Sequence, residues 1–380
     1  MLDASERIIN RLIVLILIIA FCCSFIACEY GRESAIADSP DENALETQVQ
    51  EDKQIGDNAK ENSTKSDIVI GIHTMVFTDD DLEALTGSLP QLADMGINLV
   101  IVEVGYYYQY ESHPEFGEEA DISFTAARRL SEKAKELGIK IAPGFNCLGH
   151  QSWGRNTSPL LTVYPELDET PGKYKNNVGI YCRSWCPLNE DVNPIIFDLI
   201  DELMDAFDTQ AFHVGMDEVF IIGDEDCPRC SGRDAGELFA KQVNDLYKHI
   251  VIENGGEMYM WADRLLDGAA LDDVYSEWES SYNGTYTAID LIPKDIILCD
   301  WHYDALEDYP SIDYLVNAGF RVLTASWNDI DATEKLIIKT MQSRQENDRV
   351  LGHIYTTWEI SNIEDLAEWG PMGETIDLLK

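Results

Sequence analysis

The chain has 380 residues, of which 45% are hydrophobic, and its formal net charge is −43 at pH 7. That hydrophobic content is ordinary for a globular protein and excludes a wholly disordered chain. The large excess of acids argues against binding to nucleic acids and other polyanions, because phosphate groups are bound mainly by lysine and arginine.

Residues 1–28 are predicted to be a lipoprotein-type signal peptide. Arg7 and Arg11 precede an apolar run, 12–27, that is shorter than the roughly 20 residues of a membrane-spanning helix. A basic flank, a short apolar stretch and a small residue at the junction are typical of a secretion signal. The run ends in a segment that resembles a bacterial lipobox, so Cys28 is the expected lipid anchor; an uncleaved N-terminal anchor is the alternative. Either way, we expect an exported protein held at the cell envelope by its N-terminus.

Residues 29–66 are predicted to form a flexible acidic linker. They are rich in Glu, Asp, Asn, Ser and Lys and contain few large apolar residues. Such a segment buries too little apolar surface to offset the entropy lost on ordering. The folded domain is therefore expected to comprise residues 67–380.

From residue 67 onward, short apolar runs alternate with helical patterns. Between the runs, apolar residues recur at spacings of three and four, which is typical of a helix that packs on a sheet. Eight such strand–helix units in about 310 residues favour an α/β fold of the (β/α)8 barrel type. A doubly wound open sheet is the alternative, but no glycine-rich phosphate turn follows the first strand. The predicted strands lie at 67–73, 97–104, 139–145, 211–215, 257–261, 296–301, 320–326 and 351–357.

Polar side chains follow nearly every predicted strand. In a barrel, the C-terminal ends of the strands meet on one face, where active sites are built. We therefore expect the functional site on that face. The residues at these strand ends are His73, Glu103, Asn146, Asp217, Asp263, Asp300, Asp329 and Glu359.

The adjacent acids Asp217 and Glu218, called the acid pair below, follow the apolar strand at 211–215. Two carboxyl groups held together at low dielectric do not both ionise easily, so the pKa of one of them is raised. A proton donor beside an anion is what acid–base catalysis requires at neutral pH.

Three segments resemble motifs of family 20 of the glycoside hydrolases, the β-N-acetylhexosaminidases. Residues 213–218, with the sequence HVGMDE, resemble the family's His-x-Gly-Gly-Asp-Glu motif. Residues 141–150 resemble its third-strand segment, which ends in Pro-Gly-His, and residues 258–263 resemble its fifth strand, which ends in Trp and an acid. The segments stand in the family's order, and the resemblance covers residues 67–380.

The resemblance implies hydrolysis of a β-linked N-acetylhexosamine in a glycan, with retention of configuration. In that mechanism the substrate's own acetamide oxygen attacks the anomeric carbon and forms an oxazolinium ion. By analogy Glu218 is the general acid and then the general base. Asp217 orients the acetamide N–H and balances the developing positive charge. His150 and His213 would support the pair by hydrogen bonds.

The resemblance also implies a sugar pocket with tryptophan walls and with acids that bind hydroxyl groups. Glu103, at the end of the second strand, is a further candidate for binding sugar. The residues matching the pocket are Trp261, Asp263, Trp301, Trp327, Asp329, Trp358 and Glu359.

Two departures from the family pattern affect specificity. The segment 73–75 lacks the arginine that grips the terminal sugar, and the segment 326–329 lacks the tyrosine that donates to the acetamide oxygen. Two alternatives therefore stay open. One is a glycosidase of altered or chain-internal specificity, and the other is a non-catalytic, tethered carbohydrate-binding protein.

Four cysteines flank the strand that carries the acid pair: Cys182, Cys186, Cys227 and Cys230. Four thiols at these spacings could hold a structural zinc ion. Disulfides are equally compatible with an exported protein. Disulfides or free thiols are favoured, so no cofactor is predicted, and zinc is kept as the alternative.

The segment 147–190 is too long for an ordinary connection, and segments of that length are usually functional. It is predicted to form a wall or lid over the site. Its aromatic residues include Trp153, Tyr181 and Trp185.

Overall fold

The computed structural model describes residues 68–119, 121–358 and 362–380. The predicted signal peptide, the linker, the anchor Cys28 and the candidate Glu359 lie outside the described residues. Among the described helices, none has both the length and the apolar character needed to cross a membrane.

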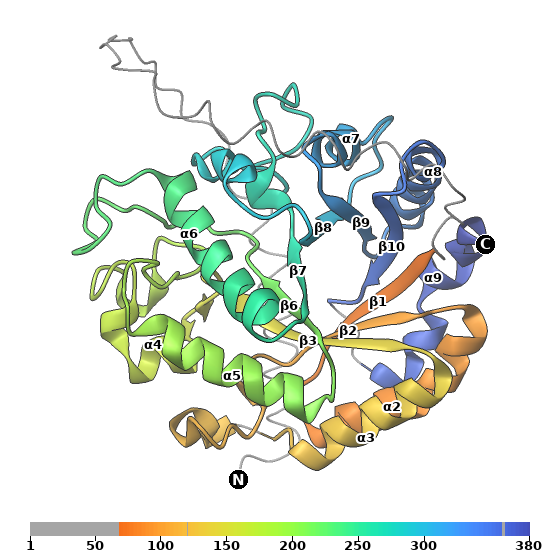
Figure 1. The fold of residues 1–380 in the computed structure, drawn as a ribbon, viewed down its shortest axis with the longest axis horizontal. Coiled ribbons are helices and arrows are strands. Elements are labelled where there is room, and N and C mark those ends of the chain that lie inside the picture. Colours follow the sequence, from red (N-terminus) through yellow and green to blue (C-terminus); the bar gives the residue numbers. More distant parts are fainter. Residues whose placement is uncertain (1–67, 120, 359–361) are drawn as a thin grey trace, which may run out of the picture. The chain divides into compact units, whose positions relative to one another are not determined.

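Eight parallel strands close into a barrel in the order β1-β10-β9-β8-β7-β6-β3-β2 (Figure 1). Because β1 pairs with both β2 and β10, the sheet has no free edge. This confirms the predicted barrel and excludes the open sheet. The strands are β1 (Val69–Met75), β2 (Leu99–Glu103), β3 (Lys140–Cys147), β6 (Ala211–Gly215), β7 (Glu257–Trp261), β8 (Ile297–Trp301), β9 (Arg321–Ser326) and β10 (Val350–Thr356).

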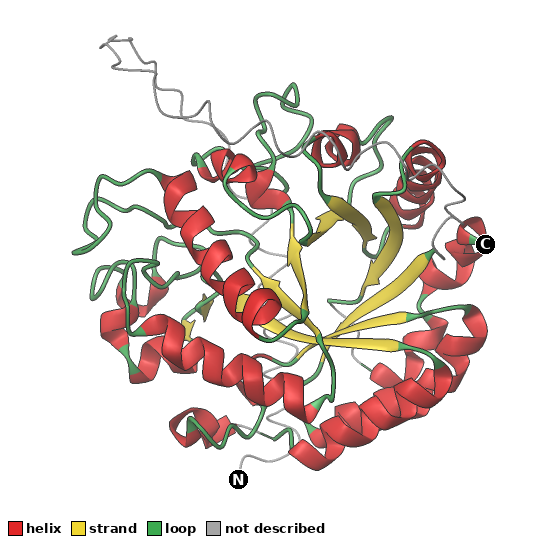
Figure 2. Cartoon of the chain, viewed as in Figure 1, coloured by secondary structure: helices red, strands yellow, loops and turns green. Residues whose placement is uncertain are grey.

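Helices surround the strands (Figure 2). The first, α2, begins at a capping box: the Thr78 hydroxyl accepts from the Asp81 N–H, and the Asp81 carboxylate accepts from the Thr78 N–H. It ends at Gly96, whose φ of 102° is left-handed. The α-helices are α2 (Asp79–Met95), α3 (Phe124–Leu137), α4 (Pro159–Val163), α5 (Val192–Ala206), α6 (Ala235–Tyr247), α7 (Pro310–Asn317), α8 (Ile330–Glu346) and α9 (Gly370–Thr375).

The strands are buried on both faces, which explains why they are continuous apolar runs. Side chains that alternate along a strand point either into the barrel or toward the helices. The inward side chains, among them Ile101, Tyr259, Trp261 and Leu323, form one buried cluster. The outward side chains and the apolar faces of the helices form a second, larger one.

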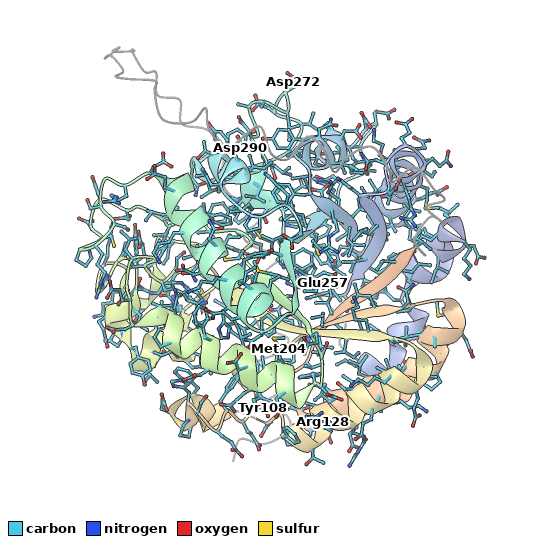
Figure 3. All side chains as sticks on the ribbon, in the orientation of Figure 1. Tyr108, Arg128, Met204, Glu257, Asp272 and Asp290 are labelled. Atoms are coloured by element: carbon cyan, nitrogen blue, oxygen red, sulfur yellow. The ribbon has the colours of Figure 1, made fainter. Side chains whose placement is uncertain are left out.

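Acidic side chains of the outer loops are exposed to solvent. Figure 3 labels Asp272 and Asp290, both of which are exposed. At the N-terminal end of the barrel, Glu257 instead pairs with Lys140 at 2.8 Å and with Arg321 at 3.1 Å. Exposed acids contribute mainly to solvation and to the negative field around the domain.

Candidate active site

The acid pair follows β6 directly, at the C-terminal end of the barrel. The backbone there is left-handed at Gly215, Met216 and Glu218, with φ of 67°, 72° and 49°. Residues other than glycine rarely adopt this conformation, and it is often found at functional sites. Because this turn ends the strand, the two side chains do not point to opposite faces, and both carboxyl groups reach His150. Met216 is fully buried.

Gly215 of β6 lies against β3, where it pairs with Cys147. A Cβ atom at this position would lie 1.9 Å from the Asn146 Oδ1 atom. The close approach, together with the positive φ, explains why this position of the motif is a glycine.

His150 lies between the two carboxyl groups. Its Nε2 atom is 3.2 Å from Asp217 Oδ2 and 3.1 Å from Glu218 Oε2. Burial alone would lower the pKa of His150, but the negative charge of Asp217 and the contacts to both acids raise it well above its usual value. The imidazole therefore carries a proton at neutral pH and balances negative charge in the site.

Asp263 lies beside the backbone of Glu218. Its Oδ2 atom accepts from the Glu218 N–H at 2.9 Å and from Arg264 Nε at 2.7 Å, and Trp301 Nε1 donates to its Oδ1 at 3.4 Å. Burial raises the pKa of Asp263 to about 6, although Arg264 opposes this shift. With its oxygens engaged and the residue only 2% exposed, Asp263 acts by fixing Glu218 and Trp301.

His213 is placed differently from the prediction. Its Nδ1 atom accepts from the Gly215 N–H at 3.1 Å. Its ring packs against Trp261, with ring centroids 4.6 Å apart. Burial, joined by the nearby His73, lowers its pKa well below the usual value, so the ring is neutral. Among the described residues, no hydrogen bond joins it to the acid pair.

The four predicted tryptophans converge above the barrel interior. Trp261 and Trp358 have ring centroids 5.7 Å apart. Tyr303 connects the others: its ring lies 4.9 Å from Trp301 and 5.4 Å from Trp327, and its hydroxyl accepts from Trp358 Nε1 at 2.7 Å. Tyr303 was not among the residues predicted from the sequence. Its position two residues after Trp301, on the same side of the chain, was the available signal.

The long segment between β3 and α5 covers the acid pair in part. The Tyr181 ring contacts His150 at 5.7 Å, Trp153 at 5.6 Å and Trp278 at 4.8 Å. Burial and the nearby Glu218 carboxylate raise the pKa of Tyr181, so its hydroxyl stays protonated. Trp185 does not belong to this wall: it is buried in the core, where its Nε1 donates to Gln242 Oε1 at 3.0 Å.

The two remaining candidate acids have local partners. Glu103 Oε2 lies 3.1 Å from His73 Nε2, and the His73 ring packs on Trp358 at 4.2 Å. Asp329 is exposed and caps α8, where its Oδ1 accepts from the Ala332 N–H at 2.9 Å. Glu103 is therefore linked through His73 to Trp358, whereas Asp329 is an exposed helix cap.

Several buried polar atoms at the strand ends lack a hydrogen-bond partner within the described part of the chain. In folded proteins such atoms are rare, because leaving them unpaired is costly. Their concentration around the acid pair and the tryptophans indicates a site that binds a polar ligand. They are His73 Nδ1, Asn146 Oδ1, His213 Nε2, Asp217 Oδ1 and Trp327 Nε1.

The four cysteines that flank the acid pair do not come together, which corrects the sequence-based grouping. Cys182 lies apart, with its Sγ 3.8 Å from the Glu218 carbonyl oxygen. Cys186, Cys227 and Cys230 gather around Glu169 instead. The described cysteines are all free thiols.

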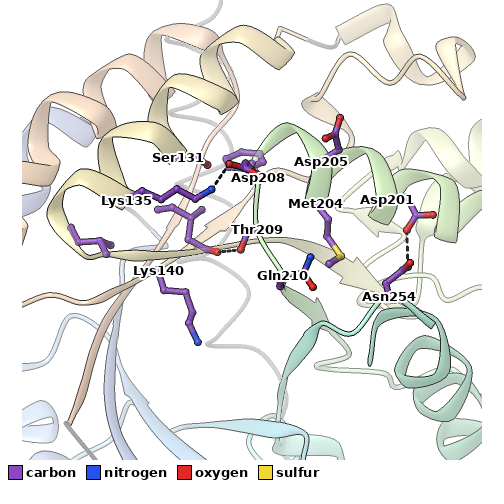
Figure 4. A pocket seen from close by; sticks show the side chains of 13 residues that line it. Ser131, Lys135, Lys140, Asp201, Met204, Asp205, Asp208, Thr209, Gln210 and Asn254 are labelled. Atoms are coloured by element: carbon purple, nitrogen blue, oxygen red, sulfur yellow. Dashed lines mark hydrogen bonds and ion pairs between the residues drawn. The ribbon is translucent and has the colours of Figure 1, made fainter. Parts of the chain in front are cut away.

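A cavity of about 710 Å³ lies away from the acid pair (Figure 4). It is lined in part by Lys135 and Asp208, which form an ion pair, and by Thr209, which precedes β6. It therefore opens near the N-terminal ends of the strands, opposite the acid pair, and is not part of the candidate site.

A second buried cluster, around His302, makes the stability depend on pH. His302 lies 3.1 Å from Asp300 and 3.2 Å from Glu279. Burial would lower its pKa, but these acids raise it to about 9. In the unfolded chain histidine has a pKa of about 6.5. The contribution of His302 to the free energy of unfolding is therefore fully present below that pH and is lost as the pH rises through about 9.

We therefore expect the free energy of unfolding to fall by about 3 kcal/mol between about pH 6 and pH 10 because of this residue. Urea unfolding of the wild type and of His302→Gln at both pH values measures the effect. The variant should lose most of this pH dependence. An equal fall in both proteins would contradict the assignment.

The sequence matches the model of glycosyl hydrolase family 20, catalytic domain, over residues 101–367, which is more than half of the chain. The structure resembles the chitobiase of Flavobacterium johnsoniae, with 19% identity, a TM-score of 0.58, and coverage of 81% of this chain and 47% of that one. It also resembles an exo-β-N-acetylglucosaminidase of Vibrio harveyi solved with N-acetylglucosamine (14% identity, TM-score 0.60, coverage 83% and 54%). A β-N-acetylhexosaminidase of Bacteroides fragilis is similar as well, with 14% identity, a TM-score of 0.57, and coverage of 83% of this chain and 65% of that one.

This chain spans about half to two thirds of the length of those structures. At these identities the likeness supports the fold. The comparison with curated proteins found no match.

Proposed function

The chain belongs to glycosyl hydrolase family 20, and on that premise we propose that it hydrolyses β-linked N-acetylhexosamine from a glycan with retention of configuration. The observation that carries the proposal is the acid pair with His150 Nε2 lying 3.2 and 3.1 Å from its two carboxylates, beside unpaired polar atoms and tryptophan rings. Aromatic faces suit a sugar ring, and unpaired donors and acceptors suit its hydroxyl and acetamide groups.

In the first step, Glu218 donates its proton to the glycosidic oxygen as the bond to the anomeric carbon breaks. The acetamide oxygen of the substrate attacks that carbon and forms the oxazolinium ion. Asp217 accepts a hydrogen bond from the acetamide N–H and stabilises the positive charge that develops there. Its Oδ1 atom, which has no partner among the described residues, is available for that bond.

In the second step, Glu218 accepts a proton from water as the water attacks the anomeric carbon. Each of the two displacements inverts the configuration at the anomeric carbon, so the product has the original configuration. Asp263 supports both steps by holding the Glu218 backbone. The protonated His150 offsets part of the negative charge of Asp217 and Glu218.

Tyr303 is the best candidate for the donor to the acetamide oxygen, a function that the segment before Asp329 does not supply. Its hydroxyl accepts from Trp358 Nε1, which leaves its own proton for another acceptor. Burial, joined by the charges of Asp217 and Glu218, raises its pKa, so the proton is retained. A neutral donor of this kind would hold the acetamide oxygen in position for its attack on the anomeric carbon.

The first-strand end favours a second candidate, an enzyme of altered specificity. Where the family has an arginine, this chain has His73, which is 1% exposed and bonded to Glu103. A histidine–carboxylate pair offers an acceptor to sugar hydroxyls, whereas the arginine offers only donors. The terminal sugar is therefore bound by different contacts.

The test is hydrolysis of aryl β-N-acetylglucosaminide and β-N-acetylgalactosaminide, followed by N-acetylglucosamine oligosaccharides of increasing length. Release of single sugars from the chain end is the expected result. Release of longer fragments would identify the chain-internal alternative, and binding without turnover of any acetamido sugar would overturn the proposal.

A further inference from the structure

Three cysteines and one glutamate form a buried cluster beside the active site. Cys186 and Glu169 lie on the segment between β3 and α5, and Cys227 and Cys230 lie between β6 and α6. One ligand atom from each residue lies within 4.8 Å of the others, and all four residues are buried. We propose that this cluster is a structural zinc site with three thiolate ligands and one carboxylate.

The distances match a tetrahedral site. Zinc–sulfur bonds of about 2.3 Å at tetrahedral angles separate two sulfur atoms by roughly 3.8 Å. Here Cys227 Sγ lies 3.5 Å from Cys186 Sγ and 3.4 Å from Glu169 Oε2. Cys230 Sγ lies 2.7 Å from Glu169 Oε1. A small movement outward would place all four around one ion.

The charges call for a cation. Glu169 is 0% exposed, and a buried carboxylate is unfavourable without a positive partner. The hydrogen-bond partners of its side chain within the described ranges are the Asp224 N–H and the thiols of Cys227 and Cys230, none of which is cationic. A zinc ion bound here would place a cation in direct contact with the carboxylate and the three thiolates.

The backbone around Cys227 is arranged for a thiolate. The Cys230 N–H donates to Cys227 Sγ at 3.4 Å, within a Cys-x2-Cys turn. This spacing is common in structural zinc sites, and an N–H donor stabilises negative charge on the sulfur. The Asp224 N–H does the same for Glu169 Oε1 at 3.1 Å.

A disulfide explains the cluster less well. Any bond between two of the three thiols leaves the third thiol and the buried carboxylate together without a cation. Zinc engages all four residues at once. It would also tie together the two loops that frame the acid pair, since the segment with Cys186 carries Tyr181 and the loop with Cys227 also carries Asp217 and Glu218.

The inference does not depend on the substrate, and its test reads the metal directly. The full chain is purified, its zinc is measured by plasma mass spectrometry, and its thiols are mapped by peptide mass spectrometry. We expect about one zinc ion per chain, with Cys186, Cys227 and Cys230 reduced. A chain without zinc, or one with a disulfide between any two of these cysteines, would overturn the site.

A second measurement covers the case in which ligand variants fail to fold. Co²⁺ exchanged into the unaltered chain should give the intense visible absorption of a tetrahedral cobalt–thiolate site. Cys227→Ala should lose both the zinc and this absorption. Cys299→Ala, a matched change of a buried cysteine inside the barrel, should keep them. Weak octahedral absorption by the Co²⁺ chain, or zinc unchanged in Cys227→Ala, would contradict the proposal.

Discussion

Replacing Glu218 with glutamine should lower kcat for an aryl β-N-acetylglucosaminide by about 10³-fold, the usual contribution of a positioned acid–base group. The amide keeps the shape of the side chain but neither donates the acid's proton nor accepts one from water. Steady-state kinetics measures the effect, which should lie in kcat rather than in KM, because Glu218 acts in the transition state.

The leaving group sharpens this test. A strongly activated aryl group departs without protonation, so the first step should be much less affected in the variant, and the second step should become rate-limiting. Glu257→Gln is the matched control, since Glu257 lies at the opposite end of the barrel with Lys140 and Arg321. Full activity in Glu218→Gln would remove Glu218 from the mechanism.

Asp217→Asn should lower kcat by about 10²- to 10³-fold, the range found when one oriented electrostatic contact is lost from a site of developing charge. Asparagine retains a similar shape, but it no longer balances the positive charge of the oxazolinium. The effect should be largest for acetamido substrates, since the contact is to the acetamide group.

The same variant has a second readout at His150. The charge of Asp217 helps to raise the pKa of His150, so the pKa should fall in Asp217→Asn. An NMR titration of the imidazole measures it. Asp272→Asn, in an exposed loop, should leave both kcat and this pKa unchanged. An unaltered His150 pKa in Asp217→Asn would show that the two side chains do not interact as described.

The barrel could be predicted because its strands are buried on both faces. A continuous apolar run such as 211–215 therefore indicated both that the segment is a strand and that the strand is buried. The ends of those strands then placed the acid pair, with Asp263 and the tryptophans, on one face. These features follow from local pattern and from the geometry common to all barrels.

The remaining features depend on loops that meet only in space. Tyr181 and Tyr303 reach the site from separate connections. Their positions in the sequence indicate the segments that carry them, but not the side chains that they contact. The cysteine spacing suggested Cys182 as a partner of Cys186, yet the loop carries Cys182 to the Glu218 backbone and brings Glu169 to the thiols. The orientation of His213 could not be predicted for a similar reason. Its ring accepts from the Gly215 N–H and does not reach the acid pair.

In the mechanism proposed above, the substrate's acetamide group is the nucleophile and the acid pair assists it. Proton NMR of the hydrolysis of an aryl β-N-acetylglucosaminide, run beside the matched aryl β-glucoside, tests this most directly. We expect turnover of the acetamido substrate alone, with the β anomer of N-acetylglucosamine appearing first. Initial release of the α anomer, or equal hydrolysis of the glucoside, would contradict it.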